Sequence, residues 1–549
     1  MGWDAAKRME SLGLRLHPVD LCILVAYLLT LAGIGIYFSK RQFKLEDFFL
    51  ARRRMTWLPI GLSLMAALNS GIDYLMQPSA VIKYGLVLLV SNLSWFLLYP
   101  YVFFITLPLY RRLEVYSAYD YLERRFNVGV RGLGAAIFML WRIGWMATAL
   151  YVPCLAISTA TGRRDLLLPM IVTLGGLVTF YTMLGGIKAV IWTDVIQFCI
   201  MFAGLAGSVA VAWWNVPGGS DEIVQSGWAV RSGQPPLPPP WLPGFFGQVE
   251  HFFMIPVTAI GLFIATMVGR VATYTSDQVM VQRFQTTRTL RDARQGFLIT
   301  AVSDTVWMLA LALVGVFLFA YFQHHPIPQA VQQNPDNIFP YFLGEVFPIG
   351  LTGLVIAAIL AASLSSIDSA INSLTSVATL DFYRRIYLGD TRQEQDLSDT
   401  EQRRLVSASR VFTLLIGIVG TALASNVDRL GTIFEIANKL INSFTGPMLG
   451  IFLLGMFTKR TNSTGAFLGG FVGTGVTLGV VYLSSLEVPR ISFIWPSTFG
   501  LVSTVAIGYL CSLITGSSSP EQQQWRFREV LTNSCSFRPA WKDAGVHKA

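Results

Sequence analysis

The chain has 549 residues, of which 53% are hydrophobic and only 13% are charged, whereas about 25% charged residues is usual in soluble domains. A water-soluble fold could not hide so much apolar side chain, because surface must grow with size, and the composition excludes an ordinary soluble protein. The net charge of +9 lies in short clusters between apolar runs. That distribution sets membrane topology and differs from the single basic patch of a nucleic-acid-binding protein.

The chain contains many segments that could cross a membrane, since a spanning helix needs about 20 mostly apolar residues. This criterion predicts thirteen segments, at residues 19–38, 57–83, 87–110, 129–160, 166–184, 188–214, 250–275, 295–322, 339–380, 406–426, 431–457, 461–484 and 493–515. The 339–380 segment is too long for one crossing, and we expect it to continue as a helix into the cytoplasm. The first run is retained as a helix and is not a cleaved signal.

Loops rich in lysine and arginine alternate with loops that contain few of them. One set of alternate loops holds twenty-two basic residues, and the other set holds six. The basic side is cytoplasmic by the positive-inside rule, so we expect a plasma-membrane protein with its N-terminus outside and its C-terminus inside. The segments then divide into an external lead 1–18, a first helix and basic loop 19–56, an external Pro/Gly-rich loop 215–249, two final helices 458–515 and a cytoplasmic tail 516–549. The 215–249 loop is expected to have little regular structure.

The second segment carries polar residues near its middle. Asn69, Ser70, Gly71 and Asp73 interrupt an apolar run, and Pro78 follows. This combination predicts a broken helix whose unwound carbonyls could bind a cation. The alternative is a proline-kinked helix whose polar groups are satisfied internally.

The ninth segment is rich in serine. Ala362, Ser365, Ser366 and Ser369 recur at i, i+3, i+4 and i+7, so they share one helix face. Asp368 lies one turn from Ser365, and hydroxyl oxygens with a carboxylate are ligands that a small hard cation takes. Close helix packing explains the small residues equally well, but it does not explain Asp368.

Further ionisable residues lie in apolar runs. Asp194 follows a glycine pair in the stretch GGIKAVIWTDVIQF, residues 185–198, where the glycines predict a tight turn. Arg142 and Arg270 also lie within apolar segments. Each arginine could neutralise one of the aspartates at positions 73, 194 and 368 as a structural ion pair, or could hold a substrate carboxylate by a bidentate contact.

These stretches resemble the sodium:solute symporter family over nearly the whole chain, roughly residues 19–515. GGIKAVIWTDVIQF is the most specific motif. TSDQVMVQRF (275–284), SAYDYLERRFN (117–127) and GPMLGIFLLGMFTKRTNSTGA (446–466) also look like family motifs in the expected order. The resemblance is greatest to the branch of monocarboxylate and multivitamin carriers.

The resemblance implies an all-α, polytopic fold of about 13 transmembrane helices with a LeuT-type core of two inverted five-helix repeats, here 57–214 and 250–457. It also implies a sodium site formed by the broken helix and the serine helix. Carried over by position, its residues are Ala66, Asn69, Ala362, Ser365 and Ser366.

The resemblance further implies a second cation site and a substrate site. The second cation site would use Asp194, Asp368 and Ser369 together with Ser365, and the aspartate at 368 stands where some members have serine. That aspartate could strengthen the site or carry a proton. The substrate site would use Asp73, Gln77, Arg142 and Arg270. Two arginines favour an anionic substrate over a neutral sugar.

The function expected from the resemblance is sodium-coupled secondary active uptake of a small polar solute, with an organic anion favoured, by alternating access. Its partners would be the solute, sodium and the lipid bilayer, with no cofactor beyond sodium, no nucleic acid and no obligate protein partner. The alternatives are a proton-coupled transporter on the same fold, uptake of a neutral sugar or amino acid, or a channel. A membrane enzyme is not expected, since no intramembrane histidine base is present.

Overall fold

The computed structural model describes residues 17–39, 44–161, 163–216, 218–232, 252–255, 257–327, 337–392, 396–427, 433–486 and 491–532. Regular structure within these residues is helical, with one isolated bridge between Met55 and Thr287. Most of the N-terminal lead 1–18, the loop 215–249 beyond residue 232 and the tail beyond 532 lie outside the described residues.

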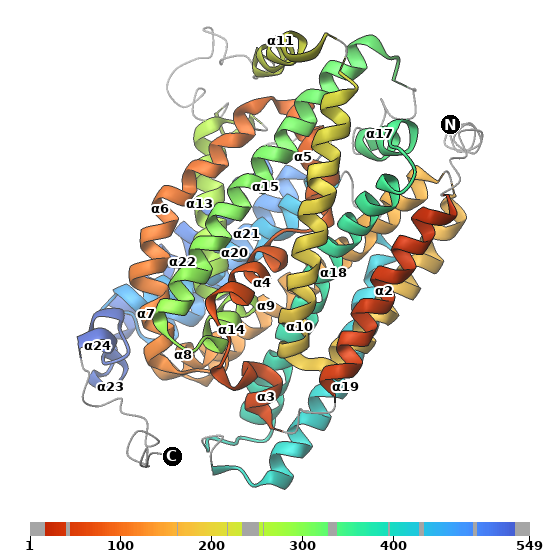
Figure 1. Ribbon diagram of the computed structural model, residues 1–549. Helices are drawn as coiled ribbons and strands as arrows, with labels where there is room; N and C mark the ends of the chain where they lie inside the picture. The colour runs from red at the N-terminus through yellow and green to blue at the C-terminus, as the bar shows by residue number, and fades with distance from the viewer. Residues whose placement is uncertain are drawn as a thin grey trace, which may run out of the picture.

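The helices pack together as a bundle (Figure 1). They are α2 (Pro18–Ser39), α3 (Leu45–Leu50), α4 (Trp57–Leu68), α5 (Gly71–Tyr84), α6 (Ser94–Tyr101), α7 (Leu107–Leu113), α8 (Ala118–Arg125), α9 (Val128–Ala160), α10 (Leu167–Trp214), α11 (Gly219–Ser232), α13 (Ala259–Ser276), α14 (Gln278–Thr286), α15 (Leu290–His324), α17 (Ile338–Val346), α18 (Leu351–Val377), α19 (Asp399–Ala424), α20 (Ile433–Phe457), α21 (Ser463–Ser484), α22 (Pro496–Thr515), α23 (Pro520–Gln523) and α24 (Phe527–Thr532). Shorter 3₁₀ or π segments are η1 (Ala51–Arg53), η2 (Leu86–Leu93), η3 (Val102–Thr106), η4 (Arg164–Leu166) and η6 (Ala378–Tyr387). Ten helical stretches among the described residues are long and apolar enough to cross a membrane.

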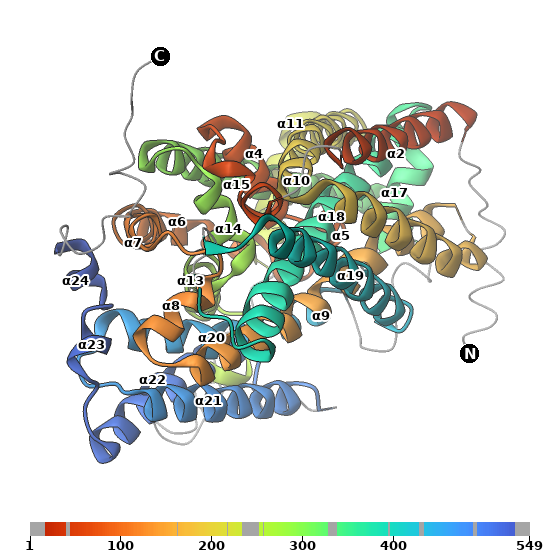
Figure 2. The same cartoon turned by 90° about the horizontal axis from the view of Figure 1, so that it is seen from below.

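Helix α18 lies at the centre of the bundle, and α2 and α22 lie at its edges. The most apolar window of α18 is 94% buried, whereas those of α2 and α22 are 22% buried. Seen from below, α2 and α19 lie on one side of α18, and α20, α21 and α22 lie on the other (Figure 2). The serine helix predicted from the sequence is therefore the one most enclosed by protein.

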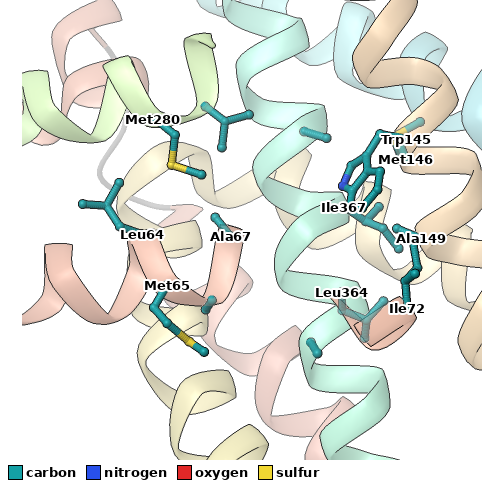
Figure 3. Packing of buried hydrophobic residues seen from close by; sticks show 14 of the residues in the cluster. Leu64, Met65, Ala67, Ile72, Trp145, Met146, Ala149, Met280, Leu364 and Ile367 are labelled. Atoms are coloured by element: carbon teal, nitrogen blue, oxygen red, sulfur yellow. The ribbon is translucent and has the colours of Figure 1, made fainter. Parts of the chain in front are cut away.

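Apolar side chains pack α18 against α9. Leu364 and Ile367 of α18 lie beside Trp145 and Ala149 of α9 (Figure 3). All four side chains are buried. The polar face of α18 meets α4, α10 and α14 instead.

The predicted interruption of the second segment is confirmed. Helix α4 ends at Leu68, Asn69 and Ser70 are extended, and α5 begins at Gly71. Ser70 caps α5: its hydroxyl accepts the N–H of Ile72, and a carboxylate oxygen of Asp73 accepts the N–H of Ser70 at 2.8 Å. A reciprocal cap of this kind satisfies exposed helix-end donors. The alternative of one continuous kinked helix is therefore wrong.

A second interruption was not predicted. Helix α13 ends at Ser276, Asp277 is extended, and α14 begins at Gln278. The Asp277 carboxylate caps α14 by accepting the N–H of Val279 at 2.9 Å. This break could not be predicted from the sequence, because Asp277 comes just after the apolar run 250–275, where an ordinary helix end is expected.

The glycine pair bends α10 sharply. Gly186 has φ +54° and ψ −167°, a conformation that glycine adopts without steric penalty. The predicted segments 166–184 and 188–214 lie on the two sides of this bend. The predicted tight turn is confirmed.

Two expectations are wrong. The 339–380 segment is not one helix: it divides into α17 and α18 around residues 347–350, where Gly350 has φ +86°. The loop 215–249, predicted to be external, is also more regular than expected, because its residues 219–232 form α11. The glycine and proline content of the loop as a whole predicted irregular structure, but residues 219–232 contain no proline.

Candidate functional site

The broken helix and the serine helix meet at five oxygen atoms. The Ser365 hydroxyl donates to the carbonyls of Ala66 at 2.8 Å and of Ala362 at 2.9 Å. The Ser366 hydroxyl donates to the carbonyl of Asn69 at 2.9 Å. All five residues are buried. The structure thus brings together the set predicted for the sodium site, and its oxygens are of the hard, uncharged kind that suits an alkali cation.

The side chain of Asn69 joins this group to a buried ion pair. Its amide donates to the carboxylate of Asp304 on α15 at 3.1 Å. The same carboxylate accepts from Arg270 at 2.9 Å and from the indole of Trp95 at 2.9 Å. Arg270 in turn donates to the hydroxyl of Ser94. The backbone break at Asn69 is therefore tied to α13 and α15 as well as to α18.

The partners expected for the two arginines are wrong. Arg270 pairs with Asp304, and Arg142 pairs through its Nε and Nη2 groups with the two carboxylate oxygens of Asp277 at the second break. Arg142 also lies 4.5 Å from the ring centroid of Trp141. Asp304 was missed, although an acidic residue in the apolar run 295–322 met the same criterion that selected Asp194.

Gln77 and Asp73 lie along α5. The Gln77 amide is 3.3 Å from the sulfur of Met308, which lies one turn beyond Asp304 on α15. Asp73 is 8% exposed and is bound through Ser70. Gln77 and Arg270 thus both contact the same face of α15, whereas Arg142 is held at the second break.

Asp194 contacts Arg283, one of the twenty-two basic residues that the positive-inside count placed in the cytoplasmic loops. One of its carboxylate oxygens accepts from Arg283 on α14 at 2.8 Å and from Ser63 at 2.5 Å. Arg283 also donates to the hydroxyls of Ser63, at 2.8 Å, and of Ser369. Arg283 is fully buried, so its placement in a solvent-exposed loop was wrong.

Asp368 is surrounded by hydroxyl groups. Tyr181 of α10 donates to its carboxylate at 3.0 Å, Thr193 lies 3.4 Å away, and Ser369 lies 3.3 Å away. Among the described residues no arginine or lysine forms an ion pair with Asp368. Asp194, Asp368 and Ser369, together with Arg283, therefore form one buried polar cluster on α10, α14 and α18, which we name the Asp194 cluster.

The chain was compared with known proteins. A model of the sodium:solute symporter family matches residues 48–473. The sodium/sialic acid symporter NanT of Aliivibrio fischeri is 30% identical over 495 residues, which cover 89% of this chain and 91% of that protein. The sodium-dependent multivitamin transporter of Oryctolagus cuniculus is 31% identical over 514 residues, which cover 91% of this chain and 76% of that protein.

A solved structure is similar throughout. The substrate-bound, outward-open state of a Na⁺-coupled sialic acid symporter superimposes with a TM-score of 0.78 at 28% identity, and the match covers 91% of this chain and 98% of that one. Interrupted helices that meet in the interior of a membrane bundle are typical of secondary transporters. The protein is a polytopic membrane carrier. It belongs to the sodium:solute symporter family, which confirms the predicted family, sodium-coupled solute transport and the absence of an enzymatic role.

Proposed function

We propose that this protein takes up a small organic anion, driven by sodium, from a multi-pass position in the plasma membrane with its N-terminus outside and its C-terminus in the cytoplasm. The observation that carries the proposal is the contact of Ser365 and Ser366 with the carbonyls of Ala66 and Asn69. A cation bound there would hold the broken helix to the central helix of the bundle.

The proposed architecture is a LeuT-type core of inverted repeats at 57–214 and 250–457 with thirteen crossings, one before the repeats and two after. Two features support it. Each repeat begins with an interrupted helix, α4/α5 in the first and α13/α14 in the second. The ten long apolar stretches become thirteen if α10 crosses twice and α4/α5 and α20 each cross once.

The proposed sodium site consists of Ala66, Asn69, Ala362, Ser365 and Ser366. Sodium binding there would favour the conformation in which α4/α5 is joined to α18, and this conformation would bind the solute. Linkage then requires the solute to tighten sodium binding by the same factor. Entry of one sodium charge down a membrane potential adds about 2.3 kcal/mol per 100 mV.

We propose a second cation-binding position at Asp194, Asp368 and Ser369. Two fully buried carboxylates support it, because such groups require positive charge nearby. The cation can be an ion from solution or a charged group of the chain itself.

The proposed solute contacts are Asp73, Gln77, Arg142 and Arg270. Both arginines are already paired with aspartates, so an anionic solute would bind by sharing or replacing a carboxylate that a guanidinium now holds. The relatives support this class, because sialic acid is a carboxylic acid. Solute, sodium and lipid are the proposed partners, without a nucleic acid, an obligate protein or a cofactor beyond sodium.

The test is uptake by the purified chain in proteoliposomes, with radiolabelled sialic acid, monocarboxylates, vitamins, sugars and proline offered in turn. We expect one anion to accumulate under an inward sodium gradient and not without it. Accumulation of a neutral sugar or of proline would overturn the anion proposal. Uptake that follows a proton gradient and ignores sodium would overturn the proposed sodium site.

A further inference from the structure

Arg283 has the position and the contacts of a bound cation. Its guanidinium lies between helices α4, α10 and α18, where it donates to Asp194, Ser63 and Ser369. A further N–H donates to the carbonyl of Val279 in its own helix at 3.0 Å. A carboxylate and two hydroxyls are the kind of oxygen ligands that a sodium ion would use, and here they surround a fixed positive charge.

We propose that the Arg283 guanidinium is a built-in cation that takes the place of a second sodium ion at Asp194, so that this carrier binds one sodium ion per chain. The inference rests on the proposed function and specifies the cation of the Asp194 cluster. Arg283 is suited to this role because its guanidinium stays charged and its fork of donors can contact several oxygens at once.

The charge balance of the cluster supports a single sodium ion. With both carboxylates ionised, Asp194 and Asp368 carry two negative charges, and Arg283, which is paired with Asp194, supplies one positive charge. One sodium ion at Ser365 and Ser366, a single turn from Asp368, supplies the second. A further sodium ion would leave an uncompensated positive charge in a fully buried cluster, which a low-dielectric interior strongly disfavours.

Two other buried ion pairs and Asp73 do not change this balance. Arg142 and Asp277 form one neutral pair, and Arg270 and Asp304 form another. Asp73 accepts the N–H of Ser70 at the amino end of α5, where the partial positive charge of the helix end faces it.

The carboxylate of Asp194 also has an oxygen to offer a second ion if the arginine is removed. Its Oδ2 is shared by Ser63 and Arg283, while its Oδ1 is buried without a hydrogen-bond partner among the described residues. Replacing Arg283 by a neutral residue removes the guanidinium from Oδ2, which keeps its contact with Ser63, and from the Ser369 hydroxyl, which keeps its contact with Asp368. The substitution therefore turns the arginine position into an open oxygen-lined site.

The test counts sodium ions bound to the purified full chain in nanodiscs, with radioactive sodium and no solute. We expect one ion per native chain, two per Arg283→Gln chain, and one per Arg283→Lys chain, because lysine restores a fixed cation. The matched control is Arg131→Gln. Arg131 is also a buried arginine bound to a fully buried aspartate, Asp381, but in a different part of the bundle, so its loss should leave one ion.

Two ions on the native chain would overturn this inference and leave the proposed function intact. One ion on the Arg283→Gln chain, with a native melting temperature, would also overturn it. No sodium binding by the native chain would overturn the proposed function itself. The native count needs no variant, so the inference is tested even if Arg283→Gln fails to fold.

Discussion

The hydroxyl of Ser366 donates a 2.9 Å hydrogen bond to the main-chain carbonyl of Asn69, and the two residues are 297 positions apart in the chain. The contact joins the central helix to a backbone break, where the carbonyl has no helical partner of its own. Ser365 makes the matching contact with Ala66. Substitution of these two serines by alanine therefore removes the hydrogen bonds between α18 and the broken helix without altering the charge of the protein.

The first prediction concerns these serines. The double substitution Ser365→Ala with Ser366→Ala removes two of five candidate ligands, so we expect sodium affinity to fall at least about tenfold, or about 1.4 kcal/mol. The sodium affinity is measured from the sodium dependence of uptake in proteoliposomes. Ser373→Ala is the control, because Ser373 donates only to carbonyls of its own helix in the described structure. Unchanged sodium dependence in the double variant would show that the site lies elsewhere.

The second prediction concerns the pair Arg270 and Asp304. Arg270→Met leaves a buried carboxylate without its arginine, and such a loss costs about 3–5 kcal/mol of stability. Adding Asp304→Asn removes the charge and keeps one oxygen acceptor, for Asn69 or for Trp95. We expect the double variant to melt at a higher temperature than Arg270→Met alone, while both transport poorly. If Arg270→Met alone melts like the native protein, the ion pair does not have the structural role assigned to it.

The sequence was sufficient to predict the broken second segment, because asparagine, serine, glycine and aspartate in an apolar run have few structural explanations. The face of α18 was also predictable, since Ser365 and Ser366 follow from helical periodicity alone. Ion-pair partners were not predictable in this way. Arg142 and Asp277 are 135 positions apart, and only the folded bundle brings them together.

Arg283 illustrates why part of the site was missed. A positive-inside count treats every arginine beyond an apolar run as solvent-exposed, and Arg283 comes after the predicted end at residue 275. The break at Asp277 turns the chain so that α14 enters the bundle instead. A short amphipathic helix that follows an undetected interruption cannot be distinguished from a loop by hydropathy alone.

The third prediction concerns the close approach of α5 to α18. A Cβ added at Gly71 would lie 2.3 Å from the hydroxyl oxygen of Ser363 and 2.6 Å from the carbonyl of Ile359. Gly71→Ala must therefore push the broken helix away from α18. We expect weaker sodium binding and a lower melting temperature, both measured on purified protein. Gly176→Ala in α10 is the control, because a Cβ there meets nothing within 4 Å. Equal effects of the two substitutions would contradict the close approach.

The fourth prediction concerns pH and Glu123 of α8, which lies outside the candidate membrane-spanning stretches. The Glu123 carboxylate contacts Arg131 and Arg385. Partial burial raises the pKa of its carboxyl, but the hydrogen bonds from Arg385 and Arg131 outweigh burial and hold that pKa below the ordinary 4.5. A lowered folded-state pKa contributes stability that is present above the unfolded-state pKa and is lost as pH falls through the folded-state value.

Glu123→Gln should therefore lower the melting temperature at pH 7, and the difference from the native protein should shrink as pH falls below about 4.5, the unperturbed pKa of the carboxyl. Melting curves of both proteins over this pH range give the measurement. Glu521→Gln, at an exposed glutamate of α23, is the control and should show no such dependence. A difference between Glu123→Gln and native protein that stays constant down to low pH would mean that Glu123 contributes through packing, and that its carboxylate charge does not stabilise the network.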